Sequence, residues 1–285
     1  SVGEIDIFVE KYRHLLFDAF RAPYPYCYRC PVQKSYPDCG IACIDRFEEI
    51  VKRHNREIGA CIIEPMVQGA AGMIVSPPGF LKKVERICRR YKILLIADEV
   101  ATGFGRTGRM FACEHEGIRP DFLCLAKGIT GGYLPLAATL TTDKVYRNFL
   151  GRYDQYKAFF HGHTYTGNQL GCAAALASLD IFKNEKVLKR MVPKVRLFSK
   201  LLQGISTLEQ VGDVRHIGLI AGIELVKERS KKTPYPPGKR IGKEVCTAAL
   251  EEGLIIRSIG DVIILMPPLS IKESELKGMV NVVRR

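Results

Sequence analysis

Apolar residues recur along the chain in two patterns that predict different elements. Uninterrupted apolar runs, typical of buried strands, occupy residues 58–63, 93–97, 122–126 and 136–140. Apolar residues spaced three or four positions apart predict amphipathic helices at 79–91 and 170–182. Because helices separate the apolar strands, the pattern predicts an α/β fold with a mostly parallel central sheet that is covered on both faces.

The pattern changes beyond about residue 184. A long charged helix is expected there, and shorter strands and helices follow it. We therefore predict a large domain over residues 1–184 and a smaller α+β domain over residues 185–285. The elements expected in the smaller domain are helices at 186–205, 241–251 and 272–283 and strands at 214–216, 219–226, 254–257 and 262–265.

The 285 residues carry a formal net charge of +13, which raises the question of an acidic partner. The lysines and arginines are scattered at helical spacings without stacking aromatic residues between them, so we expect solvated helix faces and no nucleic-acid site. No apolar stretch reaches the roughly 18 residues that span a bilayer, so no membrane association is expected. Ten cysteines without a visible export signal predict reduced thiols in the cytoplasm.

Four of the cysteines are clustered in a loop rich in proline and tyrosine. Two close pairs, Cys27 with Cys30 and Cys39 with Cys43, could together hold a zinc ion, because thiolates are good zinc ligands. The spacing only approximates the paired CxxC form. Free thiols in a surface loop are the alternative, and metal binding is not a firm prediction. The other six cysteines mostly lie in apolar runs and are interpreted as core residues.

Two ionisable residues follow neighbouring strands of the predicted sheet. Asp98 follows the strand at 93–97, and Lys127 follows the strand at 122–126. In open parallel sheets, ligands bind beyond the carboxyl ends of the strands. The two side chains could form a buried ion pair, or they could hold the two ends of pyridoxal phosphate. The glycines of the run KGITGG would let the backbone approach such a bulky cofactor closely.

Several longer runs carry a family resemblance that covers essentially the whole chain. IIEPMVQGAAG, DEVATGFGRTG, AKGITGGYLP and HGHTYTGNQLGCAAALASL resemble the core signatures of the class III aminotransferases, which are pyridoxal-phosphate enzymes of fold type I. The resemblance implies that Lys127 holds the cofactor as a Schiff base and carries the proton of the reaction. It further implies that Asp98 pairs with the pyridine nitrogen and that Val100 packs on one ring face.

The same resemblance assigns roles to the run HGHT. The His163 backbone, together with the Thr164 hydroxyl and amide, would hold the cofactor phosphate, in this family usually reaching across from the partner subunit. Gly162 would line the substrate pocket. A homodimer with shared active sites is therefore expected. The alternative for Thr164 is an ordinary helix cap before Gly167.

Three positions distinguish branches of the family. Relatives that act on ω-amino acids carry a glutamate where this chain has Ala70, and an arginine where it has Ile264. Arg257 matches a motif of the branch that aminates 8-amino-7-oxononanoate in biotin synthesis, where the arginine meets the substrate's distant carboxylate. The amino donor in that branch is S-adenosylmethionine or lysine. Another ω-amino-acid aminotransferase, or a non-catalytic remnant of the fold, is the alternative.

The resemblance also indicates what the chain lacks. Members of the family run well past 400 residues, and the part without a match precedes Ser1. It normally supplies a Gly-Ser phosphate turn and a tyrosine that stacks on the cofactor. We therefore expect the isolated 285-residue chain to bind the cofactor poorly and to be inactive.

Overall fold

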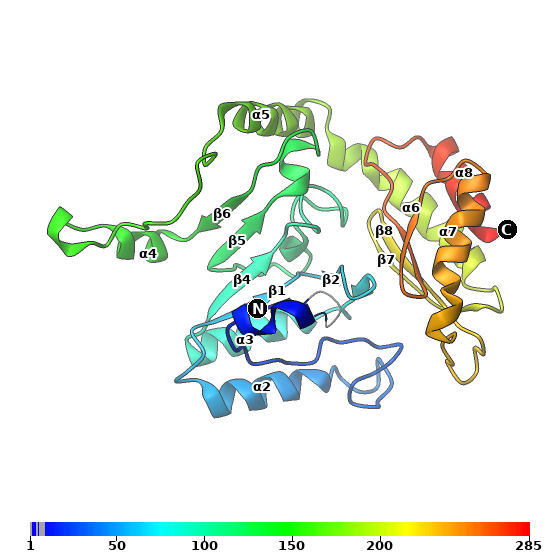
Figure 1. The fold of residues 1–285 in the computed structure, drawn as a ribbon, viewed down its shortest axis with the longest axis horizontal. Coiled ribbons are helices and arrows are strands. Elements are labelled where there is room, and N and C mark those ends of the chain that lie inside the picture. The colour runs from blue at the N-terminus through cyan, green and yellow to red at the C-terminus, as the bar shows by residue number, and fades with distance from the viewer. Residues whose placement is uncertain (1, 4, 6–8) are drawn as a thin grey trace.

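A computed structural model describes residues 2–3, 5 and 9–285. The described residues form two four-stranded sheets and a short hairpin, and Figure 1 shows the two sheets lying in separate parts of the molecule. The first sheet has the order β1-β4-β5-β6, with β1 at Ala60–Ile63, β4 at Leu94–Asp98, β5 at Phe122–Leu125 and β6 at Ala138–Thr141. β1, β4 and β5 are parallel, and β6 is antiparallel to β5. The predicted α/β fold with a mostly parallel sheet is confirmed.

One face of this sheet packs on helices. α3 (Phe80–Tyr91) places Leu81 and Val84 in a core that also contains Leu95 of β4. α2 (Cys43–His54) packs against α3 and places Val51 in the same core. α2 is not among the helices predicted from the sequence, although its apolar residues have helical spacing.

The opposite face of the sheet is not covered by helices among the described residues. Ile62 of β1 points to this face and keeps 41% of its surface exposed, and its neighbour Ile96 in β4 is half-buried. The prediction that both faces would be covered is therefore wrong for the part of the chain described here. The reason is that α2 and α3 both lie on the same side.

The second sheet has the order β7-β8-β10-β9 and is antiparallel. Its strands are β7 (Val211–Ile217), β8 (Ile220–Leu225), β9 (Arg257–Ile259) and β10 (Val262–Leu265), and its helices are α6 (Val187–Ile205), α7 (Ile241–Glu251) and α8 (Glu273–Arg284). A separate core forms here around Phe198 and Leu276. The strand expected at 254–257 lies at Arg257–Ile259 instead, because pairing with β10 sets its register. The division of the chain at residue 184 stays a prediction.

The remaining elements are short or lie outside the two cores. The hairpin pairs β2 (Val67–Gln68) with β3 (Ile74–Val75), and α5 (Gln169–Asn184) leads from the first part of the chain to the second. The short helices are α4 (Asp143–Tyr146), η1 (Glu10–Leu15), η2 (Ala112–His115), η3 (Lys127–Thr130), η4 (Arg147–Phe149), η5 (Tyr153–Gln155) and η6 (Pro237–Lys239).

A segment that we call the arm, residues 142–168, extends away from both sheets in Figure 1. It exposes large aromatic side chains, including Tyr153 at 91% and Phe160 at 78%. Exposed groups of large aromatic side chains are typical of interaction surfaces.

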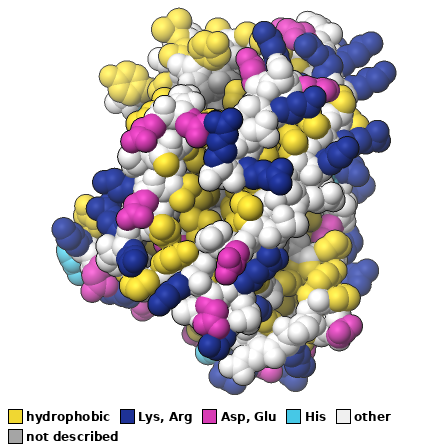
Figure 2. Space-filling view, turned by 90° about the vertical axis from the view of Figure 1, so that its right-hand side faces the viewer, with side chains coloured by type: hydrophobic (Ala, Val, Ile, Leu, Met, Phe, Trp, Pro, Cys, Tyr) yellow, Lys and Arg dark blue, Asp and Glu magenta, His cyan; other side chains and the backbone are white. Residues whose placement is uncertain are grey.

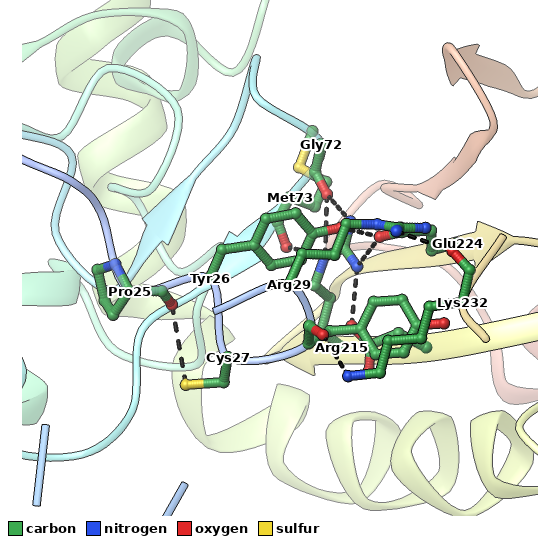
Figure 3. Close-up of polar contacts among 11 residues, drawn as sticks. Pro25, Tyr26, Cys27, Arg29, Gly72, Met73, Arg215, Glu224 and Lys232 are labelled. Carbon is green, nitrogen blue, oxygen red and sulfur yellow. Dashed lines mark hydrogen bonds and ion pairs between the residues drawn. The ribbon is translucent and has the colours of Figure 1, made fainter. Parts of the chain in front are cut away.

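A buried polar cluster, which we call the brace, joins the cysteine loop, the hairpin and the second sheet (Figure 3). Arg215 of β7 donates to the Gly72 carbonyl at 2.7 Å and to Glu224 of β8 at 2.8 Å. Arg29 donates to the same glutamate at 2.6 Å, and the Tyr26 hydroxyl also donates to it. Three segments distant in sequence are thereby held by one set of charges that satisfy one another.

The surface charge is dispersed on the side of the molecule that Figure 2 shows. Lysine and arginine side chains are interspersed with acidic and uncharged ones and do not merge into one basic patch. None of the helices that the structure describes is long and apolar enough to cross a membrane. The expectation that the chain binds no nucleic acid stays a prediction.

Candidate active site

The site lies at the carboxyl ends of the parallel strands. Asp98 is the last residue of β4, and Lys127 is the first residue of η3, two positions after β5 ends. Asp98 is half-buried, and its Oδ1 accepts a hydrogen bond of 3.1 Å from the backbone N–H of Val100. This turn fixes the half-buried Val100 directly beside the carboxylate.

Lys127 is held in a strained backbone conformation. Its φ is +46°, in the left-handed region that costs a non-glycine residue of order 1–3 kcal/mol. The side chain is exposed, and among the described residues its ammonium takes part in no hydrogen bond or ion pair. We call the edge of the first sheet where Asp98 and Lys127 follow the parallel strands the rim. The chain therefore places an unpaired lysine at the rim at an energetic cost, and such backbone strain is common at functional sites.

Glu64 lies within electrostatic reach of both Asp98 and Lys127. Burial raises the pKa of Glu64, a backbone N–H from Gly69 lowers it, Asp98 raises it and Lys127 lowers it, with a net upward shift. Both charged groups therefore lie within electrostatic reach of one carboxyl group. The sequence interpretation missed Glu64. Its position directly after the strand β1, matching Asp98 after Ala97, could have indicated it.

The neighbouring acid Glu99 has a structural role. Its side chain is fully buried, and its two oxygens accept hydrogen bonds from the backbone N–H groups of Ala112 and Cys113 and from the Thr102 hydroxyl. All of its acceptor sites face protein groups. Of the Asp-Glu pair, only Asp98 is left with a free carboxylate oxygen for a ligand.

The glycines after Lys127 have an explanation within the protein. A Cβ at Gly128 would lie 2.8 Å from the Cβ of Phe104, and Gly131 and Gly132 have φ of +63° and +87°. Packing on Phe104 and left-handed backbone turns therefore require these glycines. That these glycines also let the backbone approach the cofactor closely stays a prediction.

The run HGHT lies on the exposed arm. Gly162, His163 and Thr164 are all exposed, and the Thr166 hydroxyl accepts a hydrogen bond of 3.0 Å from the His163 backbone N–H. Asn168 caps α5 by accepting from the Gly171 N–H at 3.0 Å. The alternative that Thr164 is a helix cap is therefore wrong, and its role in phosphate binding stays a prediction.

Arg257 lies on the edge strand β9. Its side chain is exposed, and among the described residues its guanidinium takes part in no hydrogen bond or ion pair. Its cross-strand partner Ile264 is only 4% exposed and belongs to the core beneath the first sheet. In this structure an arginine at position 264 would have to be buried in that apolar core, which is costly for an unpaired charge.

Four thiols line one small pocket in the cysteine loop, namely Cys27, Cys30, Cys39 and Cys43. Burial, together with the other three thiols, raises the pKa of Cys43 to about 11. No three histidine, cysteine or acidic side chains in the described part of the chain are arranged to hold a metal ion. Zinc binding stays a prediction that metal analysis of the purified protein would test.

Comparison with known proteins places these features in a family. The sequence matches the family "Aminotransferase class-III" over residues 4–285. The chain belongs to the class-III aminotransferases. The predicted family is thereby confirmed.

The class-III relatives include adenosylmethionine-8-amino-7-oxononanoate aminotransferases from two bacteria. The one from Nitratidesulfovibrio vulgaris is 52% identical over 284 residues, and the one from Geobacter sulfurreducens is 52% identical over 282 residues. These matches cover 100% and 99% of this chain, but only 52% and 62% of the relatives. The chain thus spans little more than half the length of the curated relatives it matches.

Solved structures of aminotransferases have the same fold. The crystal structure of adenosylmethionine-8-amino-7-oxononanoate aminotransferase from Methanocaldococcus jannaschii matches with a TM-score of 0.91 and 45% identity, covering 98% of this chain and 62% of that one. An ω-transaminase from Pseudomonas jessenii in complex with PMP matches with a TM-score of 0.90 and 33% identity, covering 97% of this chain and 61% of that one.

The residues at the rim fit the cofactor that the family implies. An unpaired lysine and a carboxylate with a free oxygen stand at the ends of strands whose outer face is open. Pyridoxal phosphate requires a lysine at one end and an acid at its ring nitrogen.

Proposed function

We propose that the full-length protein is a transaminase that converts 8-amino-7-oxononanoate to 7,8-diaminononanoate in biotin synthesis. One combined observation carries the proposal. Asp98 and Lys127 lie at the ends of neighbouring strands within electrostatic reach of Glu64, and the chain is 52% identical to two relatives named for this reaction. The amino donor would be S-adenosylmethionine or lysine. The same relatives support the first of these, because their names begin with adenosylmethionine.

The chain's own residues would divide the work at the rim. Lys127 would hold pyridoxal phosphate and then move a proton at the reacting carbon, for which an exposed side-chain amine without a hydrogen-bond partner among the described residues is suited. Asp98 would keep the ring nitrogen protonated, and Val100, fixed to it by a backbone hydrogen bond, would pack on the ring. The cofactor supplies the electron sink that makes the carbon acidic.

The phosphate and the substrate would be held by residues of other segments. His163 and Thr164 would bind the phosphate from the arm, and Gly162 would line the substrate pocket beside them. Arg257 would pair with the distant carboxylate of the keto acid, since a guanidinium binds a carboxylate through two parallel hydrogen bonds. Its lack of a protein partner among the described residues supports this assignment.

The proposal includes a homodimer in the cytoplasm. The exposed aromatic side chains of the arm, with Tyr153 and Phe160 the most exposed, are suited to contact with a second copy. All ten cysteines are free thiols, which fits a reducing compartment. Analytical ultracentrifugation of the full-length protein would test the dimer.

The experiment that tests the function is an absorption measurement on the full-length protein. Addition of pyridoxal phosphate should produce the visible band of a lysine-bound cofactor. S-adenosylmethionine and lysine are then added in separate experiments, and the amino donor is the one that removes the visible band. Addition of 8-amino-7-oxononanoate should afterwards restore the band. Absence of the band from the wild-type protein would contradict the proposal.

Arg257→Ala tests the substrate assignment separately. We expect the KM for the keto acid to rise at least about tenfold, as for loss of a hydrogen bond to a charged group, while the band remains. Arg229→Ala, at an exposed arginine that binds the carbonyls of Leu208 and Ser206, is the matched control. A KM for Arg257→Ala equal to that of the control would refute the role of Arg257.

A further inference from the structure

Glu64 lies beside Asp98 on the open face of the first sheet. Ile63, the last residue of β1, pairs with Ala97 of β4 in a parallel register. One residue further along each strand, Glu64 therefore stands next to Asp98, and both side chains point to the face opposite the helices. Two carboxyl groups thus reach the rim from neighbouring strands.

The Glu64 carboxylate is fixed on one side and free on the other. Oε2 accepts a hydrogen bond of 3.0 Å from the backbone N–H of Gly69, in the loop between β2 and β3. A Cβ at position 69 would lie 3.3 Å from that oxygen, so glycine suits the close approach. Among the described residues, Oε1 has no hydrogen-bond partner.

The groups that act on this carboxylate come from three elements. Asp98 ends β4, Lys127 begins η3, and Gly69 belongs to the hairpin loop. The carboxylate itself acts on Tyr24 of the cysteine loop. Burial raises the pKa of Tyr24, and the charge of Glu64 raises it further. Lys127 is the one cation among the charged groups that act on Glu64, so the favourable electrostatic interaction of this carboxylate is with the lysine.

We propose that Glu64 is a positioning residue of the rim: its anchored carboxylate supplies a second negative charge, beside that of Asp98, that stabilises the cationic form of Lys127 and of the cofactor bound to it. This inference rests on the proposed function. It differs from a structural role, in which Glu64 would only accept the Gly69 N–H and hold the hairpin loop in place.

Glu64→Gln separates the two roles. Glutamine keeps an oxygen that accepts the Gly69 N–H but removes the charge. In the full-length protein loaded with pyridoxal phosphate, the visible band is titrated with pH, and the midpoint reports the proton on the lysine-bound cofactor. Loss of a nearby negative charge destabilises that cation, so the midpoint should fall by about one pH unit.

Three further variants complete the test. Glu244→Gln changes the same charge at an exposed site on α7 and should leave the midpoint unchanged. Glu64→Asp keeps the charge and should hold the midpoint close to the wild-type value. If Glu64→Gln does not fold, Glu64→Ala serves in the same titration, because either neutral variant must lower the midpoint.

The outcomes distinguish this inference from the function it rests on. A wild-type protein without the visible band contradicts the proposed function and this inference together. A wild-type band that titrates, with the same midpoint in Glu64→Gln and Glu64→Ala, overturns only the role of Glu64. A lowered thermal stability of Glu64→Gln with an unchanged midpoint also overturns it, because it leaves only the structural role.

Discussion

The rim and the brace each contain a glutamate removed from bulk water, and the two carboxyl groups behave in opposite ways. Burial would raise the pKa of Glu224, but hydrogen bonds from Tyr26, Arg29 and Arg215 outweigh burial and lower it. Among the described residues, the Gly69 N–H alone donates a hydrogen bond to Glu64, so burial and Asp98 leave its pKa raised. The brace is a set of charges completed within the chain. The rim is a set of charges left incomplete, which is the arrangement expected where a ligand supplies the missing partner.

Lys127→Ala should have the largest effect, because it removes the group that the rim leaves unpaired. The visible band of the cofactor should be lost, and activity should fall at least about 10³-fold, within the range for loss of a proton-transferring side chain. The free energy of unfolding of the cofactor-free protein should change by no more than about 0.5 kcal/mol, since Lys127 has no hydrogen bond or ion pair to lose among the described residues. Urea denaturation measures this, and a larger loss of stability would show that the lysine is part of the fold.

Arg215→Ala should have the next largest effect, and it acts on the brace. Removal of the guanidinium leaves Glu224 with fewer donors and the Gly72 carbonyl without one, so the free energy of unfolding should fall by about 3–5 kcal/mol. Arg229→Ala, at an exposed arginine bound only to carbonyl groups, should cost about 1 kcal/mol or less. Equal losses for the two variants, measured by urea denaturation, would remove the distinction between brace and surface.

The smallest expected effect is a change in how the free energy of unfolding depends on pH when Glu224 or Glu64 is replaced. The folded-state pKa of Glu224 is depressed, so its contribution is present above its unfolded pKa and is lost as pH falls through the folded value. Glu224→Gln should therefore flatten the acid side of the stability curve, by up to about 1.4 kcal/mol per pH unit. The folded pKa of Glu64 is raised, so its contribution is present below the unfolded pKa and is lost as pH rises.

Glu64→Gln should consequently change the curve in the opposite sense. In the wild-type protein, Glu64 lowers the free energy of unfolding as the pH rises above about 4.3, the ordinary pKa of glutamate. The variant should not show this decrease. Urea denaturation of the cofactor-free variants between about pH 3 and pH 7 compares the two glutamates directly. Changes of the same sign in both variants would contradict the comparison.

Local sequence patterns predicted the parallel strands and the placement of Asp98 and Lys127 at their ends. Those inferences depend on apolar runs and on strand direction, which are local properties. The helix α2 was not predicted, although Ile44, Phe47 and Val51 have helical spacing, because a loop rich in proline and cysteine directly precedes it and leaves its start without a clear signal. β9 was shifted because pairing with β10, and not its own residues, sets its limits.

The brace and the role of Glu64 depend on contacts that no local pattern carries. Arg215 meets Gly72 across 143 positions of the chain, and Arg29 meets Glu224 across 195. Glu64 directly follows an apolar run, as Asp98 does, and this local signal indicates a strand end without indicating which neighbour the side chain meets. Only the register of β1 against β4 places it beside Asp98.

The three rim residues come from the ends of three separate strands, at positions 64, 98 and 127. A molecule that bridges them therefore cross-links stretches of polypeptide that otherwise meet only through sheet pairing. Cofactor binding and folding are then thermodynamically linked. A cofactor present at a hundred times its dissociation constant would stabilise the native state by about 2.7 kcal/mol. Vitamin B6 supply would in this way influence how long the protein survives in a cell, apart from any effect on its turnover.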